Sequence, residues 1–398
     1  MYRQLSLMAG LIGLTASCDV SLAQRTVRPG IDVLLSDSIH LVRNIRVGLL
    51  TNQTGVDRNG IDDVTRLVES GVALTTLFSP EHGFRGALDE EHVGHSIDAA
   101  TGIPIYSLYG DVRSPGRSML ENVDLLMIDL QDIGSRTYTY VSTAVLAVEA
   151  AAAAGIPVLV ADRPNPIGGW LVQGPMLMPD HSSFVGMLPI PIRHGMTLGE
   201  LVLFANNVRE IGAEITVIPA DGWDRTMWFD ETGLPWIRPS PNMPSLESAT
   251  HYPGTVLFEA TNLSVGRGTP IAFQVLGAPW LEPTRVIDLL DTHPGVTISD
   301  TVVTPQSPAD GKHEGVAIPS VRLVVRDRTA YDPVRLAADL FRAVRTVHAD
   351  SLVIREAVMD RLAGTDQMRL GGWTREGIAS WDDDISNFVS RRARFLLY

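Results

Sequence analysis

Short apolar runs that end abruptly in polar, turn-rich clusters recur in the amino-terminal half of this chain. Runs of this length, separated by helical patterns, are typical of buried strands in a parallel α/β sheet. Because ligands bind beyond the carboxyl ends of such strands, we expect the clusters to gather along one edge of the sheet. The runs are residues 46–50, 74–78, 124–128, 157–160 and 188–192, and the clusters are 51–55, 79–86, 129–132, 162–166 and 193–197.

Length, charge and lysine content restrict the class of protein. A chain of 398 residues exceeds one ordinary core, which predicts two domains. The net charge of -14 argues against binding nucleic acid, because a broad binding surface needs lysine and arginine to replace counterions. Lys312 is the only lysine, which disfavours Schiff-base chemistry, a Walker A phosphate loop and acyl transfer from a serine–lysine pair.

Residues 1–23 have the pattern of an export signal: Arg3, an apolar stretch, and small residues before a mature start at Gln24. Cys18 offers a second interpretation, as the lipidated first residue of a bacterial lipoprotein. Since Cys18 is the only cysteine, an intramolecular disulfide and a multi-cysteine zinc site are both excluded. The body has no apolar run long enough for a membrane span, so we predict an exported protein, periplasmic or secreted.

Two domains with different patterns are expected. Residues 24–221 alternate strands with helical segments, which predicts an α/β domain. Residues 222–398 lack that alternation and predict a smaller α+β domain, joined through an aperiodic stretch at 221–255 that is rich in proline and tryptophan. The helices expected are 61–70, 141–154, 197–209 and 334–349, and 316–325 is a further strand.

Thr197 and Glu200 have the spacing of a capping box at the start of the helix expected over 197–209. We therefore interpret both as structural.

Glu81, His82 and Arg85 lie in one glycine-containing loop after the second run. A carboxyl at a strand end, partly removed from water, can serve as a general acid, so Glu81 is the first catalytic candidate and His82 accompanies it. The competing interpretation is that Glu81 pairs with Arg85 and only holds the turn.

Asp129 and Asp132 follow the third run, with Arg136 and Tyr138 next along the chain. Acids at such a turn often cap the following helix, and Asp132 has that competing interpretation. Asp129 is therefore the better second carboxyl.

Asp162, Arg163 and Asn165 are held between prolines, which leaves their side chains little entropy to lose on binding. The competing interpretation is an Asp–Arg pair that only supports this loop. Arg193, His194, Asn262 and Arg267 add polar and cationic groups near expected loop tips, where an arginine fork suits a carboxylate ligand.

Histidines at 82, 92 and 95 raise the question of a metal, with Glu90 and Glu91 beside them. The spacing of His92 and His95 is not the i, i+4 pair of a helical zinc site, and Gly94 disfavours a helix there. We predict no metal and no other cofactor.

Six motifs in order carry a resemblance over essentially the whole mature chain: residues 50–55, 79–86, 129–136, 162–166, 193–197 and 261–269. Together they resemble the exo-β-N-acetylmuramidases of the NamZ type, a bacterial glycoside hydrolase family. The resemblance implies a Rossmann-like domain joined to a smaller carboxyl-terminal domain, with the active site in the cleft between them. It also implies release of N-acetylmuramic acid from the non-reducing end of β-1,4-linked peptidoglycan fragments, in cell-wall turnover or recycling.

The glutamate of the Ser-Pro-Glu-His-Gly motif is the family's proposed catalytic acid, and it falls here on Glu81. Glycoside cleavage also needs a second group, which Asp129, Asp132, Glu259 or the acetamido group of the substrate could supply. The lactyl carboxylate of a muramic sugar has three candidate clamps, Arg163, Arg193 and Arg267. The residues expected to contact substrate are Asn52, Arg85, Gln131, Asp132, Arg136, Tyr138, Asp162, Arg163, Asn165, Arg193, His194, Glu259, Asn262 and Arg267.

We therefore predict a metal-independent, exo-acting glycosidase for muramic sugars from peptidoglycan. The alternative is a periplasmic muropeptide-binding or noncatalytic cell-wall module, in which Glu81 would only hydrogen-bond the sugar. Both predict affinity for muramic ligands, but only the first predicts turnover.

Overall fold

A seven-stranded sheet forms the centre of the amino-terminal part of the chain. The structure is a computed structural model that describes residues 26–86 and 94–398. All neighbouring strands run parallel except β3, which is antiparallel to β4. In spatial order the strands are β3 (Ser96–Ile97), β4 (Pro104–Ser107), β2 (Ala73–Ser79), β1 (Arg46–Thr51), β5 (Leu125–Asp129), β6 (Val158–Ala161) and β9 (Ile215–Ile218).

Successive side chains of each strand point to opposite faces of this sheet, and both faces are covered by helices. Val47 and Leu49 of β1 share one apolar cluster with helices α1 (Gly30–Asp37) and α2 (Asp63–Glu69). Leu50 belongs to the larger cluster that includes α3 (Tyr140–Ala154) and α4 (Leu198–Val208). The predicted parallel α/β domain is therefore confirmed.

The fifth predicted strand does not join this sheet. β8 (Pro191–Arg193) pairs antiparallel with β7 (Gln173–Met176) in a separate two-stranded sheet. Its place beside the main sheet comes from the backbone NH of Arg136, which donates to the carbonyl of Ile192. The expectation that all five clusters lie along one sheet edge is therefore wrong for the fifth. The three-residue strand before it pairs with β7 and not with the main sheet.

The carboxyl-terminal part packs helices against a three-stranded antiparallel sheet, as expected for an α+β domain. The predicted strand and helix appear as β12 (Ile318–Val325) and α7 (Pro333–Val347). The other strands are β10 (Val275–Gly277) and β11 (Val296–Val303), and the other helices are α5 (Leu246–Thr255), α6 (Pro283–Ile287), α8 (Glu356–Ala363), α9 (Gln367–Leu370), α10 (Arg375–Ala379) and α11 (Trp381–Arg392).

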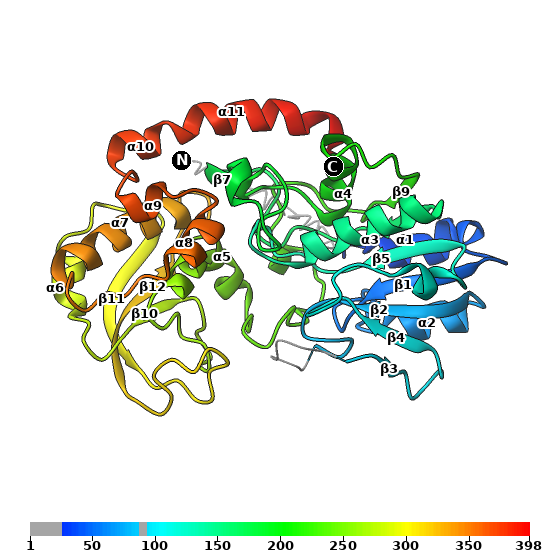
Figure 1. The fold of residues 1–398 in the computed structure, drawn as a ribbon, viewed down its shortest axis with the longest axis horizontal. Helices are drawn as coiled ribbons and strands as arrows, with labels where there is room; N and C mark the ends of the chain where they lie inside the picture. The colour runs from blue at the N-terminus through cyan, green and yellow to red at the C-terminus, as the bar shows by residue number, and fades with distance from the viewer. Residues whose placement is uncertain (1–25, 87–93) are drawn as a thin grey trace, which may run out of the picture.

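Figure 1 shows the two parts as lobes, with α11 running from the carboxyl-terminal lobe back to α4 of the amino-terminal lobe. Phe388 of α11 packs edge-on against Phe204 of α4, with ring centroids 6.0 Å apart. The phenol of Tyr398 then donates to Asp162 at 2.8 Å. The last segment of the chain is therefore part of the amino-terminal core. No helix among residues 26–86 and 94–398 has the length and apolar character to cross a membrane.

Glu200 completes the predicted capping box at the start of α4: Thr197 is the N-cap, and the carboxylate of Glu200 accepts from the backbone NH of Thr197 at 3.0 Å. The carboxylate is fully buried and pairs with Arg225 at 2.7 Å. Burial nevertheless raises the pKa of Glu200 to about 7, because removal from water outweighs the attraction of Arg225.

A pH dependence of stability follows from Glu200. Between its ordinary pKa and about 7, the folded chain holds a proton that the unfolded chain has released, so the free energy of unfolding rises as pH falls through this window. The contribution reaches at most roughly 3 kcal/mol. We expect denaturant titrations at pH 5 and pH 7 to differ less for Glu200→Gln than for wild type. An unchanged difference, as expected for the control Glu149→Gln, would contradict this assignment.

Candidate active site

Four polar clusters meet where β1, β2, β5 and β6 end, because these strands are neighbours in the parallel sheet. Glu81 stands at the end of β2, directly after Pro80, and its side chain is half-buried. The next residue, His82, has a left-handed backbone with φ of 70°, which is uncommon for a residue other than glycine and typical of functional loops.

Thr139 fixes the carboxylate of Glu81. Its hydroxyl donates to Oε2 of Glu81 at 2.5 Å, although Thr139 is also the N-cap position of α3. The hydroxyl therefore holds the acid instead of capping the helix. Arg85 pairs with Asp98 at 3.1 Å, and its side chain is 71% exposed. Because Arg85 pairs with Asp98, these contacts favour Glu81 as a catalytic acid over the alternative in which Glu81 pairs with Arg85 and only holds the turn.

Three buried tyrosines connect Glu81 to the carboxyl-terminal lobe. The ring of Tyr138 lies 4.8 Å from that of Tyr140 and 5.9 Å from that of Tyr252, which comes from α5. Burial raises the pKa of Tyr252, and the negative charges of Glu259 and Glu81 raise it further. Both carboxylates therefore lie near one phenol, and the two lobes bring them together.

Glu259 forms an ion pair with Arg267 at 2.5 Å, and both side chains are 20% exposed. The guanidinium of Arg267 also lies 5.5 Å from the ring centroid of Phe273. Two cations hold the backbone here: Nζ of Lys312 donates to the carbonyl of Glu259 at 3.2 Å, and Arg355 donates to the same carbonyl at 2.5 Å. The only lysine of the chain thus positions a candidate site residue.

A cavity of about 640 Å³, within the usual size range of small-molecule sites, is lined in part by the residues that follow Arg267. Gly268 and Thr269, which directly follow Arg267, form one wall. The opposite wall is the proline-rich segment around Asn242. Because Tyr140 donates to the carbonyl of Pro239 at 2.5 Å, the tyrosines hold that segment in place.

Asp129 is placed differently from a catalytic carboxylate. It is fully buried and forms a two-point ion pair with Arg163. A second buried acid, Asp63, lies beside this pair, and burial together with the charge of Asp129 raises its pKa. Both Asp129 and Arg163 therefore face the interior below the sheet edge.

Asp162 is a buried capping residue in this structure. It accepts from the hydroxyl of Thr197 at 2.6 Å, from the backbone NH of Gly199 at 2.8 Å and from the phenol of Tyr398. Asn165 is also buried and donates to the carbonyl of Met196 at 2.9 Å. The rigid loop between the prolines thus supports α4, which differs from the expected contact with substrate.

Asp132 and His194 form a buried pair, with Nε2 of His194 at 3.4 Å from Oδ2 of Asp132. The backbone NH of Met196 donates to Nδ1 of His194, so the ring hydrogen is on Nε2 and faces the carboxylate. Asp132 also accepts from the backbone NH of Gly134 at 2.7 Å, so it does not cap α3.

Two predicted arginine ligands serve as buried connectors. Arg136 donates to the carbonyls of Pro175 and Ile190 and, across the lobes, to the carbonyl of Ala363 at 2.8 Å. Because no carboxylate offsets its burial, the pKa of Arg136 falls to about 9. Arg193 donates to Gln173 at 2.9 Å and to the carbonyl of Ile167.

The predicted amide ligands also make internal contacts. Asn52 donates to the phenol of Tyr140 at 2.8 Å and accepts from Thr54. Gln131 donates to the carbonyl of Pro164 at 2.9 Å. Asn262 bonds the backbone of Ser351 and Val353. Asn52 alone of the three touches the tyrosines next to Glu81.

Residues 26–86 and 94–398 contain no group of three or more His, Cys, Asp or Glu side chains arranged to hold a metal ion. His95 is among these residues and accepts from the backbone NH of Ser107 at 3.1 Å. The expectations for Cys18, Glu90, Glu91 and His92 fall outside the described residues.

Three residues of the site carry no clear signal in the sequence: Tyr252, Thr139 and Lys312. Tyr252 lies within the aperiodic, proline-rich stretch at 221–255, which predicted only a connection between the two domains. Thr139 has the appearance of an ordinary helix cap. Lys312 stands out as the only lysine of the chain, but this argues only against reactions that need lysine and does not predict its place beside Glu259.

Two models of one protein family match most of this chain. The sequence matches the amino-terminal model of the exo-β-N-acetylmuramidase NamZ over residues 47–247 and the carboxyl-terminal model over residues 250–398. The chain belongs to the NamZ family. It is 42% identical over 381 residues to the peptidoglycan β-N-acetylmuramidase NamZ of Bacillus subtilis, covering 94% of this chain and 91% of the relative.

Solved structures share the fold of this chain. Two crystal structures of DUF1343 family proteins from Bacteroides fragilis match the chain with TM-scores of 0.85 and 0.74, at 32% and 31% identity. Each match covers 94% of this chain and 99% of the other. The predicted family and the two-part α/β architecture are therefore confirmed. The two family models meet between residues 247 and 250, whereas the boundary at 221 stays a prediction from composition.

Proposed function

We propose that this NamZ-family chain is an exo-acting glycosidase that releases N-acetylmuramic acid from the non-reducing end of β-1,4-linked peptidoglycan fragments. Family membership supports the reaction, and the approach of Glu81 and Glu259 to the phenol of Tyr252 supports the site. The 640 Å³ cavity lined by Gly268 and Thr269 supplies space for a sugar. Peptidoglycan turnover in an exported location is the corresponding cellular role that we propose.

Glu81 is the proposed general acid. A glycosidic bond breaks when a carboxylic acid protonates the leaving oxygen while a second group stabilises the positive charge that develops on the sugar. Glu81 is half-buried and oriented by Thr139, and its carboxyl is presented at the sheet edge. His82 contributes the left-handed turn that carries Glu81 out of β2.

Glu259 is the proposed second group, because it is the carboxylate that the carboxyl-terminal lobe brings near the same tyrosine. The acetamido group of the sugar is the competing nucleophile, as in substrate-assisted glycosidases. We assign Asp129 to the scaffold on the strength of its complete burial and its pairing with Arg163.

Arg267 is the proposed clamp for the lactyl carboxylate of the muramic sugar, since its planar fork suits a carboxylate and the two residues that follow it, Gly268 and Thr269, line the cavity. Arg163 and Arg193 are both buried against internal partners. Arg267 also has an internal partner, Glu259, but its side chain is 20% exposed, and this exposure places it first among the three arginines.

A preference for the free lactyl acid should disappear in Arg267→Ala. We expect wild type to bind N-acetylmuramic acid at least about tenfold more tightly than its lactyl methyl ester, the ratio expected for one charge-assisted hydrogen bond. Competition assays give this ratio even if loss of Arg267 also disturbs Glu259. The exposed control Arg361→Ala should keep the wild-type ratio. A ratio preserved in Arg267→Ala would refute the clamp.

Product analysis tests the proposed function itself. Two disaccharides with opposite order, one with N-acetylmuramic acid at the non-reducing end and one with N-acetylglucosamine there, are incubated with the purified protein and followed by mass spectrometry. The first should yield free N-acetylmuramic acid and the second should stay intact. Binding of the first without cleavage would favour a noncatalytic binding module.

A further inference from the structure

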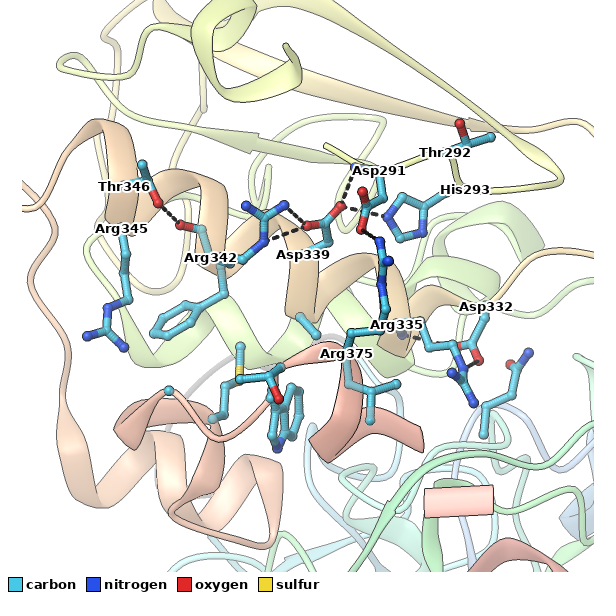
Figure 2. Close-up of a pocket in the computed structure, with 18 of the residues that line it drawn as sticks. Asp291, Thr292, His293, Asp332, Arg335, Asp339, Arg342, Arg345, Thr346 and Arg375 are labelled. Carbon is cyan, nitrogen blue, oxygen red and sulfur yellow. Dashed lines mark hydrogen bonds and ion pairs between the residues drawn. The ribbon is translucent and has the colours of Figure 1, made fainter. Parts of the chain in front are cut away.

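A second cavity lies in the carboxyl-terminal lobe, and its lining does not include Glu81 (Figure 2). Its volume is about 1140 Å³. One wall is the outer face of α7, and the other is the segment that carries α9 and α10. The loop at residues 291–294 closes the upper side. We call this cavity the arginine groove.

The arginine groove is long enough for an extended peptide. Its α7 wall runs from Asp332 to Thr346, which at 1.5 Å per helical residue corresponds to roughly 21 Å. An extended chain of about six residues has the same length. The groove also has an apolar floor, formed by the buried side chains of Phe341, Met368 and Trp373.

The residues that line the groove include four arginines and three aspartates, a local excess of positive charge in a chain whose net charge is -14. Figure 2 shows Arg335, Arg342 and Arg345 following one another along α7. Arg342 pairs with Asp339, and Arg335 pairs with Asp382 at 2.6 Å. The other two aspartates that line the groove also pair with arginines of the same chain, Asp332 with Arg335 and Asp291 with Arg375.

Two arginines of the groove remain able to take a new partner. The contacts of Arg345 within the described residues are a hydrogen bond to the carbonyl of Arg369 at 3.0 Å and the ring of Phe341 at 5.6 Å, and neither neutralises its charge. Arg375 crosses the groove to Asp291 at 3.1 Å, but its side chain is 84% exposed. An exposed pair of this kind is worth little and is easily exchanged.

We propose that the arginine groove binds the acidic peptide attached to peptidoglycan, as a second anchor for the polymer whose sugar end enters the Glu81 site. Carboxylates of the peptide would meet Arg345 and Arg375, and its alanine methyl groups would cover the floor of Phe341, Met368 and Trp373. The chemistry of the groove selects a ligand that carries carboxylates and small apolar groups on an extended backbone. The identity of this ligand rests on the proposed function.

Fluorescence anisotropy with the full chain tests this site. The probe is a fluorescein-labelled synthetic tripeptide of alanine, D-glutamate and diaminopimelate with free carboxylates. We expect saturable binding that weakens at least about tenfold in Arg345→Ala, because a charge-assisted hydrogen bond to a carboxylate is lost. Arg375→Ala should weaken binding as well, whereas Arg361→Ala removes the same charge from α8 outside the groove and should leave the affinity unchanged.

Several outcomes would overturn the proposal. They are no saturable binding to wild type, equal binding of the same tripeptide with amidated carboxyls, equal weakening by Arg361→Ala, and equal affinity for a peptide of glutamates alone. Cleavage of an aryl N-acetylmuraminide by the same wild-type preparation decides the proposed function independently. Failure of the groove and failure of the enzyme assignment are therefore distinguishable.

Discussion

Glu81→Gln should lower the turnover number by about 10²-fold or more while leaving the affinity for N-acetylmuramic acid nearly intact. The amide keeps the size of the side chain and can still contact Thr139, but it has no proton to give to the leaving oxygen. The measurement is kcat and KM for an aryl N-acetylmuraminide, with binding of the free sugar measured separately. The loss should appear in kcat.

Two comparison variants sharpen the test of Glu81. Glu121→Gln removes an exposed carboxylate outside the site and should behave like wild type. Thr139→Val keeps the acid but removes the hydroxyl that orients it, so we expect a smaller loss, roughly tenfold. Equal rates for wild type and Glu81→Gln would remove Glu81 from the mechanism.

Asp129→Asn should act on stability instead of chemistry. The substitution leaves the buried Arg163 without its charged partner, and breaking a buried ion pair from one side costs about 3 to 5 kcal/mol. We expect about 3 kcal/mol, at the lower end, because the carboxyl of the neighbouring Asp63 also interacts with the charge of Arg163. Burial and the charge of Asp129 raise the pKa of Asp63 in the wild type, and removing Asp129 relieves the second effect.

Denaturant titration measures this loss as a change in the free energy of unfolding. The matched control is Asp124→Asn, which breaks an exposed pair with Arg46 and should leave stability nearly unchanged. The folded fraction of Asp129→Asn should retain kcat within about threefold of wild type, a change of less than 1 kcal/mol in the activation barrier. A fall as large as that of Glu81→Gln, with stability preserved, would return Asp129 to the catalytic group.

The central sheet could be predicted because its information is local. Each apolar run, such as 124–128, carries both its strand character and the polar residues at its end. Four of the five runs formed neighbouring strands, and the capping box at Thr197 formed as its spacing indicated. The prediction for the fifth run was wrong because its strand pairs with β7, and residues 188–192 alone do not indicate that pairing.

Roles within the clusters were harder to predict, because they depend on contacts between distant segments. Arg136 and Arg193 looked like ligands by residue type, and only the fold reveals that backbone carbonyls occupy them. The same limit applies to Tyr252, which reaches Glu81 only once the lobes are assembled. The arginines of α7 gave no signal either, since a charged helix face usually lies in solvent.

Hydrolysis of a chromogenic aryl β-N-acetylmuraminide, compared with the matching N-acetylglucosaminide, tests the central claim most directly. Half of the reactions should contain a chelator, so that any dependence on metal is measured in the same experiment. The account predicts release of the chromophore from the muraminide alone, with the same rate in the presence of the chelator. No release from either substrate, although N-acetylmuramic acid binds, would contradict it and favour a muropeptide-binding module.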